Sequence, residues 1–451
     1  MLRFLQRRPP AIAAVAFACA VALAISPWRS HAQPVAPAPN NLVYEIFVRS
    51  FADGDHDQKG VGDLKGIVSR LDSYLNDGKP ETDTDLEVGI LWLMPIFPSP
   101  SSHGYDVTDY RGINPDYGTM ADFATLITEA HKRGVRVILD IPFNHTSNRH
   151  PWFREAVDNP ASPRRKFYSI EPDTSPPREG PWHPLTSQSG ERPRYFGLFS
   201  PEMPDLSYDN ADVRREVEDI AKFWLDRGVD GFRLDAAKHI YGNSFAKLTE
   251  DDILRNNEWW REFSDSVYRI APQAILVGEV LGDPELLRRH AWGLGGLLDE
   301  PYMNDVRNDV DHPSAGLVSR HKQFIEQARE LHRTAHDPTL PSPEPPFESY
   351  PFLASHDRNP RLASDLEDKA HHGMRYSVDE AYRLSLYILL TMSSHPVLYQ
   401  GDEIMQRGWK WNGNPRTDPN PGDGSGIFDE TLREPFQWFA SGQGRVRSHQ
   451  T

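Results

Sequence analysis

Eight short runs of apolar residues recur along the chain, and segments with helical periodicity lie between them. The runs cover residues 43–48, 90–94, 135–141, 231–234, 275–280, 296–298, 351–354 and 397–399. Apolar strands that alternate with helices are typical of β-α units around a parallel sheet. The helical segments 120–133 and 213–227 are bounded by the capping residues Thr119 and Gly228. Eight such units predict an α/β fold, a closed (β/α)8 or TIM barrel.

The interval from residue 146 to residue 208 interrupts this alternation. It contains 11 prolines and no long periodic segment. A disordered linker is one interpretation, but aromatic residues such as Trp152, Tyr168 and Phe196 favour a packed structure. We predict a loop-rich domain B, 146–208, inserted after the third strand, where barrels carry insertions at their carboxyl face. The barrel would then comprise 42–145 and 209–440, with a tail at 441–451.

The first 32 residues have the features of a secretory signal peptide. Arg3, Arg7 and Arg8 precede an apolar run over 11–25, and small residues around Ala32 suit a signal peptidase. A membrane anchor is the alternative, but it needs about 20 apolar residues. We expect cleavage after Ala32, a Pro/Ala-rich linker over 33–41, and a secreted or periplasmic protein.

Charge and cysteine content restrict the partners and the chemistry. The chain has 49 Lys+Arg against 65 Asp+Glu, a formal charge of −16. Attraction to phosphate backbones or anionic lipids needs clustered positive charge. We therefore expect no nucleic-acid partner and no membrane partner after signal cleavage. We also expect a monomer. Cys19, the only cysteine, lies in the predicted signal peptide, so thiol chemistry and disulfides are excluded elsewhere.

Acidic side chains stand at the ends of four apolar runs. Asp140 ends the third run, Asp235 follows the fourth, Glu279 ends the fifth and Asp357 follows the seventh. A single carboxylate at such a position is more often a helix cap or a surface charge. Several of them at one end of a barrel would repel one another, and acid-base chemistry is the usual reason for such an arrangement.

Four segments that contain these acids resemble, in order and spacing, the signature regions of the α-amylase family of glycoside hydrolases (family 13). They are residues 140–145, 231–239, 277–280 and 352–357, with supporting segments at 104–110, 203–206 and 401–403. The resemblance spans about residues 41 to 440. The segment from Met203 to Leu206 is similar to that of a subgroup intermediate between oligo-1,6-glucosidases and neopullulanases.

The resemblance implies a role for each acid. A retaining glycosidase needs two carboxyl groups about 5 Å apart, a nucleophile and a general acid/base. By position, these are Asp235 and Glu279, and Asp357 corresponds to the acid that binds sugar hydroxyls in the transition state. Arg233 precedes Asp235 on the same strand face and can hold this aspartate ionised. Glu279 has no basic neighbour in sequence, which is compatible with a raised pKa. The substrate-binding residues implied by the resemblance are Tyr105, His145, Arg233, Lys238, His239 and His356.

A carboxylate-rich loop follows the first predicted strand. Asp53, Asp55, Asp57 and Asp63 supply hard oxygen ligands, which suit Ca²⁺, and the family often carries a calcium loop here. Solvated surface charge is the alternative, and the spacing between Asp57 and Asp63 is two residues longer than the common pattern. The resemblance also allows Asn144 to serve a second calcium site against domain B.

The sequence departs from the family at two places. Ser355 stands where most relatives have Asn, and Arg358 begins an unusual segment after the acid. Relatives continue after Trp438 into an antiparallel β domain, whereas this chain stops at Thr451. We therefore expect the C-terminal β domain to be missing and the chain to be truncated or of low stability.

The leading hypothesis is a secreted retaining hydrolase of α-1,4-glucosidic bonds in starch or maltodextrin. An α-1,6-glucosidase or a glucosyltransferase with the same machinery is a second possibility. A truncated, non-catalytic glucan-binding protein is an alternative of a different class, although all three acids are present.

Overall fold

The computed structural model describes residues 41–55, 60–176, 180–187, 190, 192–245, 247–310, 316–334, 345–409, 430–436 and 438. These residues belong to one compact unit, Asn40–Thr451. The predicted signal peptide, most of the predicted linker, the predicted tail and Asp57 lie outside the described residues. Within the described ranges, no helix combines the length and the apolarity that a membrane crossing requires.

Eight parallel strands of the described chain form a nearly closed barrel. They are β1 (Val43–Ile46), β2 (Ile90–Leu93), β3 (Arg136–Ile141), β7 (Gly231–Leu234), β8 (Ile275–Gly278), β9 (Gly296–Asp299), β10 (Glu348–Pro351) and β11 (Val397–Tyr399). Their order is β10-β9-β8-β7-β3-β2-β1-β11. One parallel bridge, between Phe352 and Val397, connects β10 to β11 at the remaining gap. The predicted (β/α)8 fold is confirmed.

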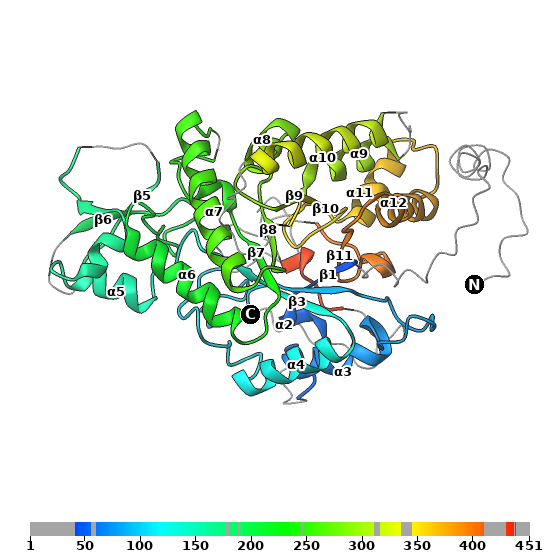
Figure 1. The fold of residues 1–451 in the computed structure, drawn as a ribbon, viewed down its shortest axis with the longest axis horizontal. Helices are drawn as coiled ribbons and strands as arrows, with labels where there is room; N and C mark the ends of the chain where they lie inside the picture. The colour runs from blue at the N-terminus through cyan, green and yellow to red at the C-terminus, as the bar shows by residue number, and fades with distance from the viewer. Residues whose placement is uncertain are drawn as a thin grey trace, which may run out of the picture. The chain divides into compact units, whose positions relative to one another are not determined.

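Helices surround this barrel, as Figure 1 shows. They are α2 (Val48–Phe51), α3 (Leu64–Ser69), α4 (Met120–Lys132), α6 (Ala211–Leu225), α7 (Glu250–Ile270), α8 (Pro284–His290), α9 (Glu300–Asp309), α10 (Leu317–Thr334), α11 (Leu362–His371) and α12 (Val378–Met392). The helix α5 (Pro151–Asp158) lies away from the barrel, beside β6. Short 3-10 or π turns occupy Leu71–Leu75, Pro163–Phe167, Ala237–His239, Asp402–Ile404 and Glu430–Leu432. Thr119 caps α4 as expected, through a reciprocal pair of hydrogen bonds with Asp122.

The seventh strand lies three residues before its predicted position. β10 spans Glu348–Pro351, whereas the apolar run predicted 351–354, and Phe352 makes only the single bridge to Val397. The prediction was wrong because Glu348 places a charge in the strand. That carboxylate is tolerated at the strand's start, where it pairs with Arg329 at 2.9 Å.

Between β3 and α6 the chain forms a small antiparallel sheet. Its strands are β4 (Ile170–Pro172), β5 (Trp182–Pro184) and β6 (Pro193–Phe196), in the order β4-β6-β5. The ring of Phe153, on α5, packs edge-on against Tyr168 and Tyr195 at centroid distances of 5.0 and 4.9 Å. The described part of this interval therefore packs around aromatic side chains.

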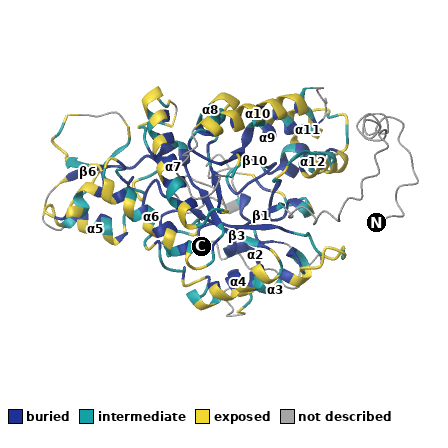
Figure 2. Ribbon diagram, in the orientation of Figure 1, coloured by how far each residue is buried: buried dark blue, intermediate teal, exposed yellow. Residues whose placement is uncertain are grey.

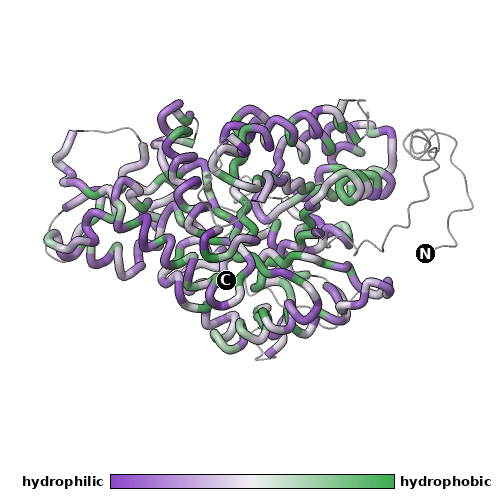
Figure 3. Tube along the Cα trace, viewed as in Figure 1, coloured by the Kyte–Doolittle hydropathy of each residue, from purple (hydrophilic) through white to green (hydrophobic). Residues whose placement is uncertain are grey.

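Two layers of apolar side chains stabilise the barrel. The larger layer lies between the strands and the helices and includes Leu91, Leu139 and Phe232, and a smaller cluster fills the inside of the barrel with Ile90, Ile138 and Val277 among others. Figures 2 and 3 show buried and apolar segments along the central strands, with exposed and polar residues on the outer sides of the helices. The barrel interior is thus a packed core, and a site can form only at its ends.

Candidate active site

The inward-facing positions of the strands change from apolar to charged toward their carboxyl ends. Side chains two residues apart in a strand share a face. On β1, inward Val43 is followed by Glu45. On β3, Ile138 is followed by Asp140, and after β8, Val277 is followed by Glu279. Because of this alternation, a group of carboxylates lies at one end of the barrel.

Arg233, on β7, joins three of these carboxylates. Its side chain is buried, and Nη1 contacts Oδ1 of Asp140 at 2.8 Å and Oδ1 of Asp235 at 2.5 Å. Nη2 contacts Oε1 of Glu279 at 2.9 Å. A planar guanidinium with fixed donors suits this arrangement better than a lysine ammonium would. Asp235 and Glu279 are therefore held by opposite ends of one cation.

Glu279 has a second partner, the backbone of the residue after Asp235. The amide of Ala236 donates to Oε2 of Glu279 at 3.0 Å. Ala236 has a left-handed backbone, with φ of 48°, which is strained for a residue with a side chain. This strained turn brings the strand ends that carry Asp235 and Glu279 into contact.

His356 lies at the centre of a second group. Its Nδ1 contacts the carboxylate of Glu45, and its Nε2 lies 3.0 Å from Oδ2 of Asp357 and 2.6 Å from the hydroxyl of Tyr105. The Tyr105 ring stacks on the imidazole at 5.6 Å, and its hydroxyl also donates to Asp140 at 3.0 Å. Burial lowers the pKa of His356, but the carboxylates of Asp357 and Glu45 raise it to about 10. His356 is therefore an imidazolium at neutral pH.

Asp357 also contacts Arg433, from the last described part of the chain. Nη2 of Arg433 lies 2.8 Å from Oδ1 of Asp357, and a third of the Asp357 side chain is exposed, 34%. Ser355, which departs from the family pattern, accepts the backbone amides of Asp357 and Arg358 at 3.3 and 3.2 Å. Asp357 is thus placed between two cations, and its loop is fixed by the unusual serine.

Burial raises the pKa of the three acids that contact Arg233, which are Asp140, Asp235 and Glu279. Burial raises the pKa of Asp235 to about 6, with Arg233 lowering it and the carboxylates of Asp140 and Asp357 raising it. Burial also raises the pKa of Glu279, against the effect of Arg233. Glu279 has no basic neighbour in sequence, but Arg233 reaches it from the neighbouring strand. Burial, and not the absence of a cation, raises its pKa.

The three acids line one hollow of about 310 Å³. Its wall also includes Tyr105, His145, Lys238, His239, Phe199 and Arg433. Burial lowers the pKa of His145 to about 4 and that of His239 to about 3, so both rings are neutral at pH 7. Nζ of Lys238 donates to the carbonyl of Leu281 at 2.5 Å. Of the sequence-predicted substrate residues, Arg233 and His356 lie behind the acids and the other four line the hollow.

The predicted calcium loop forms in part. Carboxylate oxygens of Asp53, Asp55 and Asp63 lie within 4.8 Å of one another, whereas Asp57 is not described. Asp63 is buried and accepts the backbone amides of Gly54, Asp55 and Gly66, which also makes it the cap of α3. Three convergent carboxylates are oxygen donors of the kind that Ca²⁺ prefers, so this cluster fits a calcium ion.

Asn144 lies apart from that loop, beneath domain B. Its side-chain amide donates to the carbonyl of His239 at 2.6 Å, and its oxygen lies 3.1 Å from Nδ1 of His145. The buried carboxyl of Asp205 is hydrogen-bonded to Asn144 as well. The NH2 group of Asn144, and not its oxygen, faces the His239 carbonyl, so the second calcium site stays a prediction.

Three polar residues of these sites did not enter the predicted set. Glu45 is a charged residue inside an apolar run, and this charge was the sequence signal that could have indicated a role in the site. Arg433 contacts Asp357 from 76 positions away, and Asp205 contacts Leu198 and Asn144. Only the folded chain shows the partners of Arg433 and Asp205.

Comparisons with known proteins agree with the family resemblance found in the sequence. The model of the family described as alpha-amylase, catalytic domain, matches residues 45–446. Alpha-amylase 3 of Dictyoglomus thermophilum is 38% identical over 400 residues, 88% of this chain and 67% of that protein. An oligo-1,6-glucosidase of Parageobacillus thermoglucosidasius is 42% identical over 208 residues, 44% of this chain and 35% of that protein. The crystal structure of an alpha-amylase from H. orenii superposes with a TM-score of 0.68 at 37% identity, covering 89% of this chain and 73% of that one.

Proposed function

Because this chain belongs to the α-amylase family of glycoside hydrolases, we propose that it hydrolyses α-1,4-glucosidic bonds of starch or maltodextrin with retention of configuration. The observation that best supports the proposal is that one cation, Arg233, contacts both Asp235 and Glu279. Arg233 holds Asp235 and Glu279 on either side of one guanidinium, in the hollow that Asp357 also lines. Retaining glycosidases need two carboxyl groups roughly 5 Å apart, and a bridging guanidinium favours that separation.

In the first step, Asp235 is the nucleophile and Glu279 is the general acid. The Asp235 carboxylate attacks the anomeric carbon while Glu279 donates its proton to the departing glycosidic oxygen, which forms a glycosyl ester and frees the leaving sugar. With a pKa of about 6, Asp235 is mostly ionised at neutral pH. The raised pKa of Glu279 favours the protonated form that this step needs.

In the second step, Glu279 acts as a base. It takes a proton from a water molecule, the water oxygen bonds to the anomeric carbon, and the ester bond to Asp235 breaks. The product has the original anomeric configuration and both acids return to their starting states. The amide of Ala236 remains in contact with Glu279 Oε2 and keeps the carboxyl oriented.

The remaining residues bind the sugar and its positive charge. Asp357 carries the exposed carboxylate of the hollow, and His356 and Arg433 fix its two oxygens. Hydrogen bonds to sugar hydroxyls that strengthen in the transition state contribute several kcal/mol in such enzymes. Tyr105 presents an aromatic wall, His145 and His239 present neutral rings, and Lys238 lies beside Glu279 on the side of the departing sugar.

Replacement of the nucleophile tests this proposal. Asp235→Asn should abolish the release of reducing sugar from soluble starch, because an amide cannot form the ester. Asp251→Asn, at an exposed position on α7, is a matched control and should retain full activity. Undiminished activity of the Asp235→Asn enzyme would overturn the assignment.

A related activity, α-1,6 cleavage or glucosyl transfer, is supported by two observations. The segment from Met203 to Leu206 resembles the intermediate subgroup, and the 42% identical relative is named an oligo-1,6-glucosidase. Digestion of maltoheptaose separates the possibilities. Hydrolysis yields only shorter malto-oligosaccharides, whereas transfer also yields products longer than the substrate, and release of glucose from isomaltose would indicate α-1,6 cleavage.

A non-catalytic glucan-binding role is the alternative of another class. The presence of all three acids in one hollow argues against it. Measurement of glucan binding together with turnover discriminates, because binding without turnover would favour the non-catalytic role. We also propose that the protein is exported, which detection of a chain beginning at Gln33 outside the cytoplasm would support.

Calcium is a further part of this proposal. Asp53, Asp55 and Asp63 would hold one ion, and a second ion at Asn144 stays a prediction. Bound Ca²⁺ would supply charge neutralisation and a cross-link between loops, and no chemical step. Inductively coupled plasma analysis of the purified protein, with Asp63→Asn as the comparison, measures the metal content directly.

A further inference from the structure

The loop that carries Asp357 lies next to the start of α9. β9 and β10 are neighbouring strands, and Asp299 pairs in register with Pro351 at their ends. Beyond these two residues the chain continues as α9 on one side and as the loop 352–361 on the other. Because the pairing of β9 with β10 ends here, the position of the loop against the helix depends on contacts that side chains make.

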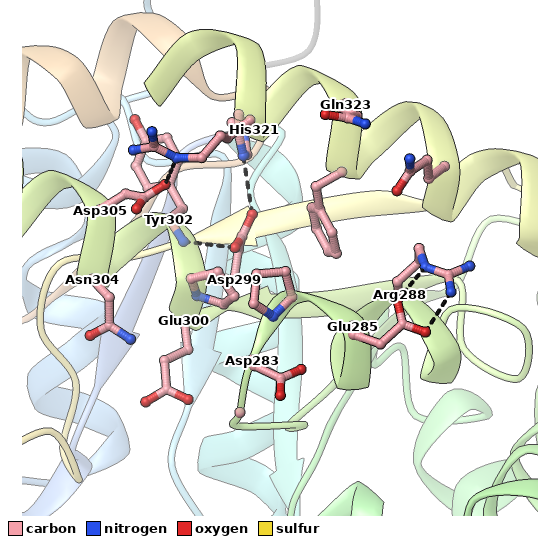
Figure 4. A pocket seen from close by; sticks show the side chains of 16 residues that line it. Asp283, Glu285, Arg288, Asp299, Glu300, Tyr302, Asn304, Asp305, His321 and Gln323 are labelled. Carbon is pink, nitrogen blue, oxygen red and sulfur yellow. Dashed lines mark hydrogen bonds and ion pairs between the residues drawn. The ribbon is translucent and has the colours of Figure 1, made fainter. Parts of the chain in front are cut away.

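One such contact is an ion pair between Arg358 and Glu300. Nη1 of Arg358 contacts Oε1 of Glu300 at 2.5 Å, and Nη2 lies 3.5 Å from Oδ1 of Asn304. Glu300 is the first residue of α9, and Asn304 lies about one turn later. Figure 4 shows the side chains of Glu300 and Asn304 extending to the same side of the helix. One guanidinium therefore connects the loop to the first turn of α9.

The ion pair is largely shielded from solvent. The side chain of Glu300 is 9% exposed and that of Arg358 is 30% exposed. Exposed ion pairs contribute little because water screens them, whereas the loss of one partner from a shielded pair leaves an uncompensated charge. The amino end of a helix also favours a negative charge, and Glu300 occupies that end of α9. The pair is therefore a firm link between the loop and the helix.

The helix α9 contacts the loop at a further point. Nη2 of Arg307 donates to the backbone carbonyl of Pro360 at 2.8 Å. Pro360 lies three residues after Asp357, whereas Arg358 is the direct neighbour of this acid. Arg307 thus fixes the far end of the segment, and Glu300 acts through Arg358 next to Asp357.

Arg358 and Arg433 hold Asp357 in different ways. Nη2 of Arg433 contacts Oδ1 of Asp357 itself at 2.8 Å. Arg358 acts on the backbone that carries the acid, since Oγ of Ser355 accepts the backbone amides of both Asp357 and Arg358. Ser355 and Arg358 are the two positions of this loop at which the sequence departs from the family pattern. Both departures therefore contribute to the same loop geometry.

Glu300 also acts on a residue of the catalytic hollow. Burial lowers the pKa of Lys238, and the carboxylates of Glu279 and Glu300 raise it. Lys238 lines the catalytic hollow together with Glu279. Substitution of Glu300 alone would therefore change the surroundings of Lys238 as well as the loop. For this reason the ion pair has to be tested from the side of Arg358 too.

From these contacts, and on the basis of the proposed function, we infer that Glu300 and Arg358 are positioning residues for Asp357. Their ion pair holds the loop so that the Asp357 carboxylate meets the sugar hydroxyls in the transition state. Neither residue lines the catalytic hollow, so both act through Asp357. Loss of an interaction that is made only in the transition state lowers kcat and leaves KM nearly unchanged.

Removal of the ion pair from either side tests this inference. We expect Glu300→Gln and Arg358→Met each to lower kcat on maltoheptaose about tenfold, with KM within about twofold of the unmodified protein. Because both substitutions break the same contact, the double variant should lose little more than either single variant. Arg358→Lys keeps the positive charge beside Glu300 and should recover most of kcat.

Asp305→Asn is the matched control. Asp305 lies on the same helix, but it pairs with Arg320 of α10 at 2.8 Å and not with the loop, as Figure 4 shows. This variant should retain kcat within about twofold, because it breaks a more exposed ion pair away from Asp357. Thermal unfolding of all variants verifies that they are folded.

Several results would overturn the inference and leave the proposed function intact. They are unchanged kcat in both single variants, a rise in KM at constant kcat, losses that add in the double variant, and no recovery with Arg358→Lys. A different result would overturn the proposed function and the inference together, namely no turnover of maltoheptaose by the unmodified protein.

Discussion

Two groups of carboxylates lie close together in this molecule, one in the hollow with Asp235 and one in the loop after β1, but their partners differ. In the hollow, Arg233, His356 and Arg433 supply cations from the chain itself. In the loop, Asp63 is held by three backbone amides. The catalytic acids are therefore ordered by the fold, whereas the loop acids form a donor set that an ion can complete. Catalytic activity should therefore depend on the cations Arg233, His356 and Arg433. The partners of Asp63 should affect only the stability of the loop after β1.

Removal of the central cation should have the largest effect. Arg233→Met leaves Asp140, Asp235 and Glu279 in a buried position without the guanidinium they share. We expect a fall in kcat/KM of more than about 10³-fold and a loss of ~3–5 kcal/mol in the free energy of unfolding, because buried carboxylates would lose their counter-ion. Denaturant unfolding and a starch assay measure the two effects. Arg215→Met, at a side chain 66% exposed, should leave both unchanged.

The acid limb of the activity profile should lie near the pKa of the buried nucleophile. The pKa of Asp235, raised to about 6 by burial and by Asp140 and Asp357, places this limb well above the 3.8 of an ordinary aspartate. As the pH falls below about 6, Asp235 gains a proton and kcat/KM on maltoheptaose should fall about tenfold between pH 7 and pH 5. A profile that stays flat down to pH 4.5 would contradict the assigned nucleophile.

Glu45 should show its contribution mainly at alkaline pH. Glu45→Gln removes one of the carboxylates that keep His356 charged, so the pKa of His356 should decrease from about 10. The raised pKa favours folding below pH 6.5, and this stabilisation disappears as the pH rises toward 10. We expect a loss in kcat/KM of roughly threefold at pH 6 that grows to about tenfold at pH 9. A loss independent of pH would indicate a purely structural role for Glu45.

The smallest effect should come from the loop. Asp63→Ala removes the cap of α3 and one carboxylate of the cluster, which should cost ~1 kcal/mol in unfolding free energy and leave kcat within about twofold. A chelator should lower the melting temperature of the unmodified protein by a few degrees and should have less effect on Asp63→Ala. If chelation abolished kcat at a temperature where the protein stays folded, the loop carboxylates would contribute to catalysis. That result would contradict the division of roles between the two groups of carboxylates.

The sequence predicted the barrel because its strands are mostly apolar runs, and seven of the eight strands lie within two residues of their predicted bounds. It failed at β10, where Glu348 stands inside the strand. The three acids that we propose as catalytic each lie in a short local segment, and the structure brings them together in one hollow. Glu45 and Arg433 could not be assigned, since their partners, His356 and Asp357, lie 311 and 76 positions away. Contacts of this kind arise from the closure of the barrel.

The most direct test is to trap the covalent intermediate. A 5-fluoro-α-glucosyl fluoride forms the glycosyl ester but slows its hydrolysis, and peptide mass spectrometry locates the attached sugar. We predict a single adduct on Asp235 that does not form on the Asp235→Asn variant and forms on the Asp251→Asn control. An adduct on another residue, or rapid turnover to an inverted product without any adduct, would contradict the account.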